Sequence, residues 1–186
     1  MPSIERANIL IISTHGFEQS ELETPRDKLR AAGATVRVAT PDGKAIKGWD
    51  KTDWGREAEA DLKIEDADPN RYDALVLPGG QINPDLLRVE DSAIALIRAF
   101  AKQGKIVAAI CHAPWLLIEA ELVATRELTS YHSIKTDVVN AGGRWMDAEV
   151  VADNGLITSR NPGDLEAFCI KIVDEIESGH HARRAA

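Results

Sequence analysis

The stretch KIVAAICHAPWLLIEAEL, residues 105–122, decides the fold. Its first half is a run of small and apolar residues, which is typical of a strand buried on both faces of a parallel sheet. Its second half has apolar residues at helical spacing and predicts a helix over about 113–121. A buried strand that runs straight into a helix is half of a βαβ unit. Cys111 and His112 lie at the turn between the two elements.

Short apolar runs and helical patterns alternate on both sides of this stretch. Further buried strands are predicted in ANILIIST (7–14), TVRVATP (35–41) and YDALVLPGG (72–80), and two more around the Asn-Gly turn of AEVVADNGLITSR (148–160). Residues 42–71 are polar and carry several glycines, which predicts short hairpin-type strands at the periphery. Strands that alternate with helices imply a mostly parallel sheet with right-handed crossovers.

Helices are predicted between these strands, each with a glycine at its end. They are EDSAIALIRAFAKQG (90–104), SIKTDVVNAGG (133–143) and GDLEAFCIKIVDEIESG (163–179). An earlier helix ends at Gly33 and holds Pro25, so it either begins near Thr24 or is kinked at the proline. The prediction is a single α/β domain over residues 1–186, a three-layer αβα sandwich with a frayed tail from about 180 to 186.

The composition limits the classes of function. Of the 186 residues, 44% are hydrophobic and 28% are charged, as in an ordinary soluble globular protein. The net charge of −8 argues against nucleic acid or an anionic membrane as the main partner. The first residues lack the apolar region of a signal peptide, and no segment reaches transmembrane length. Only two cysteines are present, which favours a reducing cytoplasm over a disulfide framework.

In such a fold, chemistry is expected outside the carboxyl ends of the parallel strands. Four polar clusters follow the predicted strands: His15 to Glu18, Gly79-Gly80, Cys111-His112, and Ser130 to His132. His15 and His132 are interpreted as loop residues at a pocket rim. Histidines and carboxylates do not stand at metal-ligand spacing on one helix, so neither a metal nor another cofactor is expected.

The cluster at Cys111 has the pattern of a nucleophile elbow, in which the nucleophile sits on a sharp turn from strand to helix. Such a turn needs small residues two positions before and after the nucleophile, and Ala109 and Ala113 meet that need. The thiol then lies near a helix N-terminus, which favours a thiolate. A lone cysteine is also often a small buried hydrophobe, and Cys169 on the apolar face of the last helix is predicted to be one.

Several segments resemble, in order, the PfpI family, the intracellular cysteine-peptidase-like branch of the class I glutamine amidotransferase-like superfamily. AAICHAPWLLIEA (108–120) is similar to the family's AICHGP elbow. GFEQSELETPRDKLRAAGATVRVATP (16–41) resembles its acidic segment, first helix and second strand, and YDALVLPGGQINPDLLR (72–88) its glycine turn and next helix. LTSYHSIKTDVVNAGG (128–143) and LITSRNPGDLEAF (156–168) resemble its C-terminal segments. The resemblance implies a flavodoxin-like fold for nearly the whole chain.

The resemblance also implies catalytic roles. The family's nucleophile matches Cys111, and its adjacent base matches His112. The carboxyl group that faces the elbow matches Glu18, which would be protonated and donate a hydrogen bond to sulfur, lowering the thiol pKa. The acid that orients the histidine comes from a neighbouring subunit in this family and matches Asp85. Glu18 and Asp85 could instead simply complement helix N-termini.

The rest of the pocket follows from the same resemblance. Gly80, in the Gly79-Gly80 turn, and the Cys111 amide would donate to an oxyanion. Tyr131 would line the pocket. Ala113 stands where the family usually has glycine, and Trp115 stands where a polar residue is common, so that the indole would narrow the pocket.

Two functions remain open. The first is a stress-response cysteine hydrolase in which Cys111 attacks a carbonyl of a small peptide, a reactive dicarbonyl or a glycated adduct, as a protease, glyoxalase or deglycase does. The second is a redox-sensing or chaperone-like stress protein that uses oxidation of Cys111. The distant histidine of the amidotransferase triad is missing, which excludes that activity. The borrowed Asp85 implies a homo-oligomer, a dimer or a hexamer, with the active site near an interface.

Overall fold

Strands and helices alternate along the chain as the sequence patterns predict, in a computed structural model that describes residues 3–179. The predicted frayed tail at 180–186 lies outside the described residues. The strands are β1 (Asn8–Ile12), β2 (Thr35–Thr40), β3 (Ile46–Asp50), β4 (Asp53–Ala58), β5 (Leu62–Lys63), β6 (Ala74–Leu77), β7 (Ile106–Ile110), β8 (Glu127–Leu128), β9 (Arg144–Trp145), β10 (Val150–Asp153) and β11 (Leu156–Ser159).

The helices occupy the segments between these strands. The α-helices are α1 (Gln19–Ala31), α2 (Ile82–Leu87), α3 (Asp91–Lys102), α4 (Pro114–Glu119), α5 (Lys135–Asn140) and α6 (Leu165–Ser178). Short 3-10 turns are η1 (Ile4–Arg6), η2 (Ile64–Asp66), η3 (Pro69–Arg71), η4 (His132–Ile134) and η5 (Pro162–Asp164).

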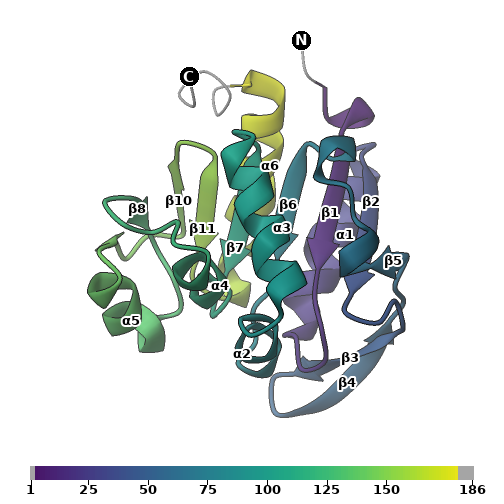
Figure 1. Cartoon of the computed structure of the whole chain (residues 1–186), viewed down its shortest axis with the longest axis horizontal. Coiled ribbons are helices and arrows are strands. Elements are labelled where there is room, and N and C mark those ends of the chain that lie inside the picture. Colours follow the sequence, from purple (N-terminus) through teal and green to yellow (C-terminus); the bar gives the residue numbers. More distant parts are fainter. Residues whose placement is uncertain (1–2, 180–186) are drawn as a thin grey trace.

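One seven-stranded sheet organises the molecule, in the order β10-β11-β7-β6-β1-β2-β5 (Figure 1). All neighbours pair in parallel except β10 and β11, which form an antiparallel hairpin. The predicted Asn-Gly turn joins that hairpin, and both Asn154 and Gly155 have positive φ, as a tight two-residue turn requires. The central strands β6 and β7 are buried along their whole length because helices cover both faces.

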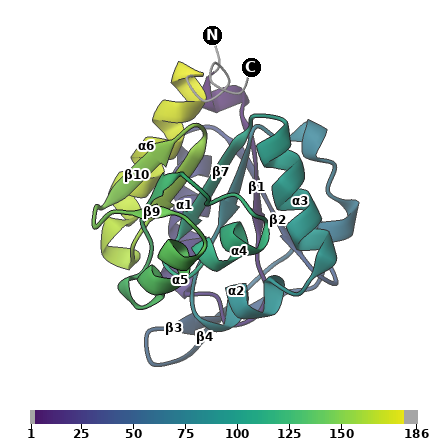
Figure 2. The same ribbon diagram turned by 60° about the vertical axis from the view of Figure 1, so that its left-hand side comes forward.

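Two apolar clusters fill the spaces above and below the sheet. Side chains of α3 and α4 pack on one face, and side chains of α1 and α6 pack on the other. Figure 2 shows α3 and α6 on opposite sides of the strands. The predicted three-layer αβα sandwich with a mostly parallel sheet is confirmed.

Two segments settle questions that the sequence left open. The helix α1 runs from Gln19 through Pro25 to Ala31, so a start near Thr24 is wrong and the proline lies in the helix interior. In the predicted peripheral region, β3 and β4 form a separate two-stranded hairpin, whereas β5 joins the edge of the main sheet beside β2.

In residues 3–179, no helix combines the length and the apolar character needed to cross a membrane.

Candidate active site

The parallel strands end at one edge of the sheet, beside the β3–β4 hairpin and α2 (Figure 1). A cavity of about 610 Å³ lies there. Its lining comes from segments far apart in the sequence: Gly16, Glu18, Glu21, Trp49, Lys51, Gly80, Gln81, Ile82, Cys111, His112, Tyr131 and Pro162. Ligand sites of parallel α/β sheets are expected at this edge.

Cys111 occupies the turn between β7 and α4 with a left-handed backbone, at a φ of 65°. This conformation costs energy for a residue with a Cβ and is common where a functional side chain is presented. Ala109 and Ala113 on either side are fully buried. The small residues therefore allow the close approach of strand and helix that defines a nucleophile elbow.

The backbone N–H of Cys111 donates to the Ser159 carbonyl at 3.0 Å and so extends the pairing of β7 with β11. It is not available to an oxyanion, and its predicted role as an oxyanion donor is wrong. Burial raises the pKa of the thiol, and the N–H groups of Gly80 and His112, which interact with the sulfur, oppose that rise in part. The amide that follows the nucleophile is the usual donor in an elbow, and here it belongs to His112.

His112 is buried between a thiol and a hydroxyl group. Its Nδ1 lies 3.2 Å from Sγ of Cys111, and its Nε2 lies 3.2 Å from Oγ of Ser133. Tyr131 stacks on the imidazole with 4.7 Å between the ring centroids. Burial, and then the charge of His132, lower the pKa of His112 to about 4. The imidazole is therefore neutral at pH 7, so that its nitrogen facing the thiol can act as a hydrogen-bond acceptor.

The carboxyl group beside the thiol is that of Glu21, and the assignment of this role to Glu18 is wrong. Glu21 is fully buried in the first turn of α1 and interacts directly with the Cys111 side chain. Its Oε2 accepts the Gly79 N–H at 2.9 Å, and its buried Oε1 has no hydrogen-bond partner within residues 3–179. Burial raises the pKa of Glu21 to about 8. A carboxyl group that stays protonated at pH 7 is able to donate a hydrogen bond to the sulfur.

The helical period explains why Glu21 is the buried acid. It shares the inner face of α1 with Leu22, Pro25 and Leu29. Glu18 precedes the first helical residue, and its side chain makes no capping hydrogen bond. If the helix is taken to begin at Gln19, the spacing of these apolar residues places Glu21, and not Glu18, on the buried face.

The thiol of Cys111 does not have the lowered pKa that the resemblance implied. Burial raises the pKa of Cys111, and a negative charge on Glu21 raises it further. Protonation of Glu21 removes this repulsion. We therefore interpret the resting site as a thiol beside a neutral acid and a neutral imidazole.

The glycine turn after β6 brings its backbone against the elbow. A Cβ on Gly79 would lie 2.6 Å from Cβ of Cys111 and equally close to Oε2 of Glu21. Gly80 has a φ of 82°, and a Cβ there would lie 2.5 Å from the Gly16 carbonyl oxygen. Only glycine permits this contact between the turn and the sulfur.

A model of the DJ-1/PfpI family matches residues 7–175. The chain belongs to this family. A deglycase of Thermococcus kodakarensis is 41% identical over 165 residues, which span 89% of this chain and 96% of that protein. Protein/nucleic acid deglycase 2 of Escherichia coli is 41% identical over 166 residues, 86% of this chain and 92% of that protein. The crystal structure of Drosophila melanogaster DJ-1beta matches with a TM-score of 0.85 and 32% identity, covering 97% of this chain and 95% of that chain.

These relatives confirm the PfpI resemblance, and their names agree with the predicted cysteine hydrolase.

Within this DJ-1/PfpI chain, Tyr131 lines the cavity as predicted, whereas Trp115 does not. The Trp115 indole N–H instead donates to Asp137 on α5 at 2.8 Å, and its ring lies edge to face with that of His112 and beneath the Arg88 guanidinium. The aromatic wall is formed by Trp49, which sequence reasoning missed because it lies in the peripheral hairpin.

Asp85 is exposed on α2 and does not line the cavity. The partner of His112 Nε2 in the described chain is Ser133, an exposed serine that no sequence signal distinguished. The contact of Asp85 with His112 of a second subunit stays a prediction. The other two histidines of the sheet edge are exposed, and Nδ1 of His15 accepts the Lys47 N–H at 3.0 Å.

Asn83 is a further buried residue that the sequence did not reveal. Its Oδ1 accepts the Thr14 N–H at 2.8 Å, and its amide donates to the carbonyl of Pro78 at 2.8 Å. It therefore ties the end of β1 to the glycine turn.

Within residues 3–179, no three His, Cys, Asp or Glu side chains are grouped to hold a metal ion.

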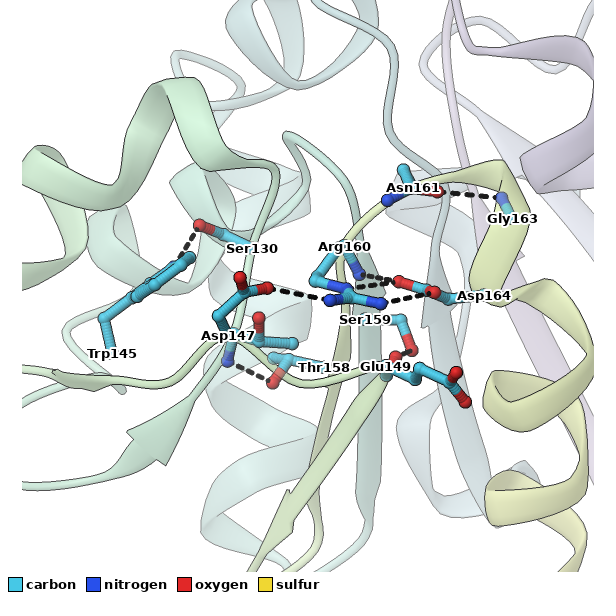
Figure 3. A network of polar contacts seen from close by, with 11 residues as sticks. Ser130, Trp145, Asp147, Glu149, Thr158, Ser159, Arg160, Asn161, Gly163 and Asp164 are labelled. Atoms are coloured by element: carbon cyan, nitrogen blue, oxygen red, sulfur yellow. Dashed lines mark hydrogen bonds and ion pairs between the residues drawn. The ribbon is translucent and has the colours of Figure 1, made fainter.

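An ion-pair clamp supports the loop that carries Pro162 into the cavity wall. Figure 3 shows Arg160 between the carboxylates of Asp147 and Asp164. The Arg160 guanidinium donates to both oxygens of Asp164, at 2.8 and 3.0 Å, and to Asp147 at 2.7 Å. This arrangement fixes the loop directly after Ser159, whose carbonyl holds the Cys111 amide.

Proposed function

We propose that this protein is a cytoplasmic, stress-related cysteine hydrolase whose substrates are reactive dicarbonyls and the adducts that they form on amino groups. The proposal is carried by the 3.2 Å contact of Cys111 Sγ with Nδ1 of a neutral His112, in a cavity of about 610 Å³. The deglycase names of the relatives support this substrate class. Both cysteines are free thiols, which suits a reducing compartment.

The chemistry starts from a hemiaminal, in which the amine nitrogen is bonded to a carbon next to a ketone. His112 takes the thiol proton, and Sγ of Cys111 bonds to the hemiaminal carbon as the carbon–nitrogen bond breaks. The amine leaves with the proton from His112. A free dicarbonyl reaches the same hemithioacetal by addition of Sγ to its aldehyde carbon.

The second half of the reaction is redox-neutral. A proton moves from the sulfur-bearing carbon to the neighbouring carbonyl carbon, and the hydroxyl proton of the hemithioacetal moves to the ketone oxygen. The hemithioacetal thereby becomes a thioester and the ketone becomes an alcohol. Water then cleaves the thioester, releasing a hydroxy acid and restoring the thiol of Cys111. The N–H groups of Gly80 and His112 are the candidate donors to the oxyanion of this step.

Replacement of the nucleophile tests the proposal. Wild type, Cys111→Ala and Cys169→Ala are assayed with methylglyoxal, its amino-acid adducts and fluorogenic peptides. Cys111→Ala should lose at least about a hundredfold in kcat/KM, because a positioned nucleophile and base supply that much or more. Cys169→Ala is the matched control, since it removes the other buried thiol. Turnover of peptides alone would reassign the protein to the peptidases, and equal activity in Cys111→Ala would contradict the proposal.

A redox-sensing role is a second candidate because Glu21 offers a neutral acid to the sulfur. A protonated carboxyl group would stabilise a sulfinate at Cys111 by a hydrogen bond. Mass spectrometry after peroxide treatment should then show sulfinate on Cys111 in wild type and less of it in Glu21→Ala. Equal oxidation of the two proteins, or oxidation of Cys169 alone, would reject this role.

A further inference from the structure

The cavity has a wall that takes no part in the proposed bond-making steps. It consists of Glu18 and the β3–β4 hairpin. The Trp49 N–H donates to the Phe17 carbonyl at 2.7 Å, and the Gly16 N–H donates to the Lys47 carbonyl at 2.8 Å. Glu18 and Trp49 also form an isolated parallel bridge. Backbone hydrogen bonds therefore hold Trp49 beside Glu18, and both residues line the cavity.

The indole of Trp49 is oriented as a wall and its polar atom is already satisfied. Its Nε1–H donates to the Lys51 carbonyl at 3.0 Å. Trp54 packs against it edge to face, with 5.5 Å between ring centroids and an angle of 76°. What Trp49 offers to the cavity is therefore its π-system, to which planar cations bind well.

The charge next to this indole is negative, and the Lys51 side chain, which lines the same cavity, acts on it without forming an ion pair. Glu18 is half-buried, and among the described residues it makes no ion pair within 4.0 Å. Burial raises the pKa of Glu18, the backbone N–H of Lys51 lowers it, and the charge of Asp50 raises it. A cation bound against Glu18 would relieve both the desolvation and the repulsion.

We propose that Glu18 and Trp49 form a subsite for a guanidinium group, so that the adducts processed by Cys111 are those on arginine side chains of peptides and proteins. The inference rests on the proposed function, because it names the substrate of the same site. A guanidinium is planar, stacks on an indole face and donates two parallel hydrogen bonds to a carboxylate. All three groups of this arrangement, the nucleophile, the carboxylate and the indole, line one cavity.

The chemistry of the adducts separates arginine from its competitors. A guanidine keeps its positive charge after one nitrogen has added to an aldehyde, whereas a lysine amine becomes much less basic once it is part of a hemiaminal. A glycated nucleotide would bring phosphate to an edge with Glu18 and Asp50, in a protein of net charge −8. The subsite therefore favours a cationic, planar adduct over a neutral or an anionic one.

Binding without turnover tests the subsite directly. Cys111→Ala is titrated by calorimetry with N-acetylarginine amide and with N-acetylcitrulline amide, which has the same shape but no charge. Arginine amide should bind at least about tenfold more tightly, and Glu18→Gln in the same background should abolish the difference, because a charge-assisted hydrogen bond accounts for about that ratio. Glu57→Gln, an exposed acid of β4, is the matched control and should leave the ratio unchanged. Equal binding of the two amides would overturn the inference.

Kinetics provide the second arm. With the methylglyoxal adduct of N-acetylarginine, Glu18→Gln should raise KM about tenfold and Trp49→Leu about threefold, and both changes should exceed the changes in KM for free methylglyoxal, which carries no guanidinium group. Equal losses on the adduct and on free methylglyoxal, or a preference of wild type for glycated guanosine, would overturn the subsite. Absence of all turnover together with charge-dependent binding would reject the proposed function and retain the subsite. Turnover without charge dependence would reject the subsite alone.

Discussion

At the scale of single residues, Glu21 and Glu18 lie less than one helical turn apart and have different roles. Glu21 is the only one of the two that is fully buried against the sulfur of Cys111. Removing a carboxylate from water disfavours its charged form, so that the acid beside the thiol keeps its proton. Glu18 stays half-buried at the cavity wall, where a charged ligand can reach it.

The raised pKa of Glu21 makes the stability of the fold depend on pH. Its pKa is about 8 in the folded protein and near 4.5 when exposed, so the native state binds one more proton than the unfolded state between these values. The contribution of Glu21 to the free energy of unfolding should therefore fall as pH rises from about 5 to 8, by at most about 1.4 kcal/mol per pH unit, whereas the lowered pKa of His112 contributes in the opposite direction below about pH 6.5. Glu21→Gln, which cannot ionise, should lose this dependence.

Denaturant unfolding at pH 5, 6, 7 and 8 measures the effect. Glu57→Gln serves as the control for loss of an exposed acid and should follow the wild-type profile. If Glu21→Gln and wild type keep a constant difference in the free energy of unfolding across this range, Glu21 is ionised in the folded protein and the interpretation of the site is wrong.

At the scale of elements, the loop between β11 and α6 is held by two carboxylates that differ in burial. The side chain of Asp164 is 7% exposed, and that of Asp147 is 69% exposed, although both pair with Arg160. Asp164→Asn should destabilise the fold by about 2 kcal/mol, because it breaks a buried, charge-assisted bidentate pair.

Asp147→Asn is the matched substitution on the same guanidinium and should cost no more than about 0.5 kcal/mol, because exposed ion pairs contribute little. The shift of the urea midpoint at constant slope measures both losses. Equal shifts would show that burial does not set the strength of this clamp.

The local patterns predicted most elements because apolar periodicity reports burial directly. The strand and helix around the elbow, and the hairpin at the Asn-Gly turn, came out as expected. The start of α1 did not, since Pro25 suggested a boundary that the helix does not have. Packing of the inner face of α1 outweighs the hydrogen bond that proline removes.

At the scale of the whole molecule, an apolar stripe is left uncovered near the cavity. Ile82 and Leu86 on α2, and Val89 two residues after its end, are 38%, 46% and 78% exposed. Asp85 lies on the same short helix. The predicted homo-oligomer would bury this stripe, which is the usual fate of clustered exposed apolar side chains.

Light scattering coupled to size-exclusion chromatography tests this prediction. Wild type should elute as a dimer or larger, and Leu86→Glu should shift it toward the monomer, because a buried charge without a partner opposes association. Ile170→Glu, on the exposed side of α6 and 52% exposed before substitution, is the control and should leave the mass unchanged. A monomeric wild type would contradict both the oligomer and the borrowed role of Asp85.

The layers of the fold, the nucleophile elbow and the pairing of Cys111 with His112 follow from the sequence, since each depends on residues that are neighbours in the chain. Packing between distant segments places Glu21 beside the sulfur, engages the Cys111 amide with Ser159, and brings Ser133 to His112 and Trp49 to the cavity wall. The physical reason is that these contacts join segments separated by long stretches of sequence. Their chemistry depends on burial, and burial exists only once the segments have packed.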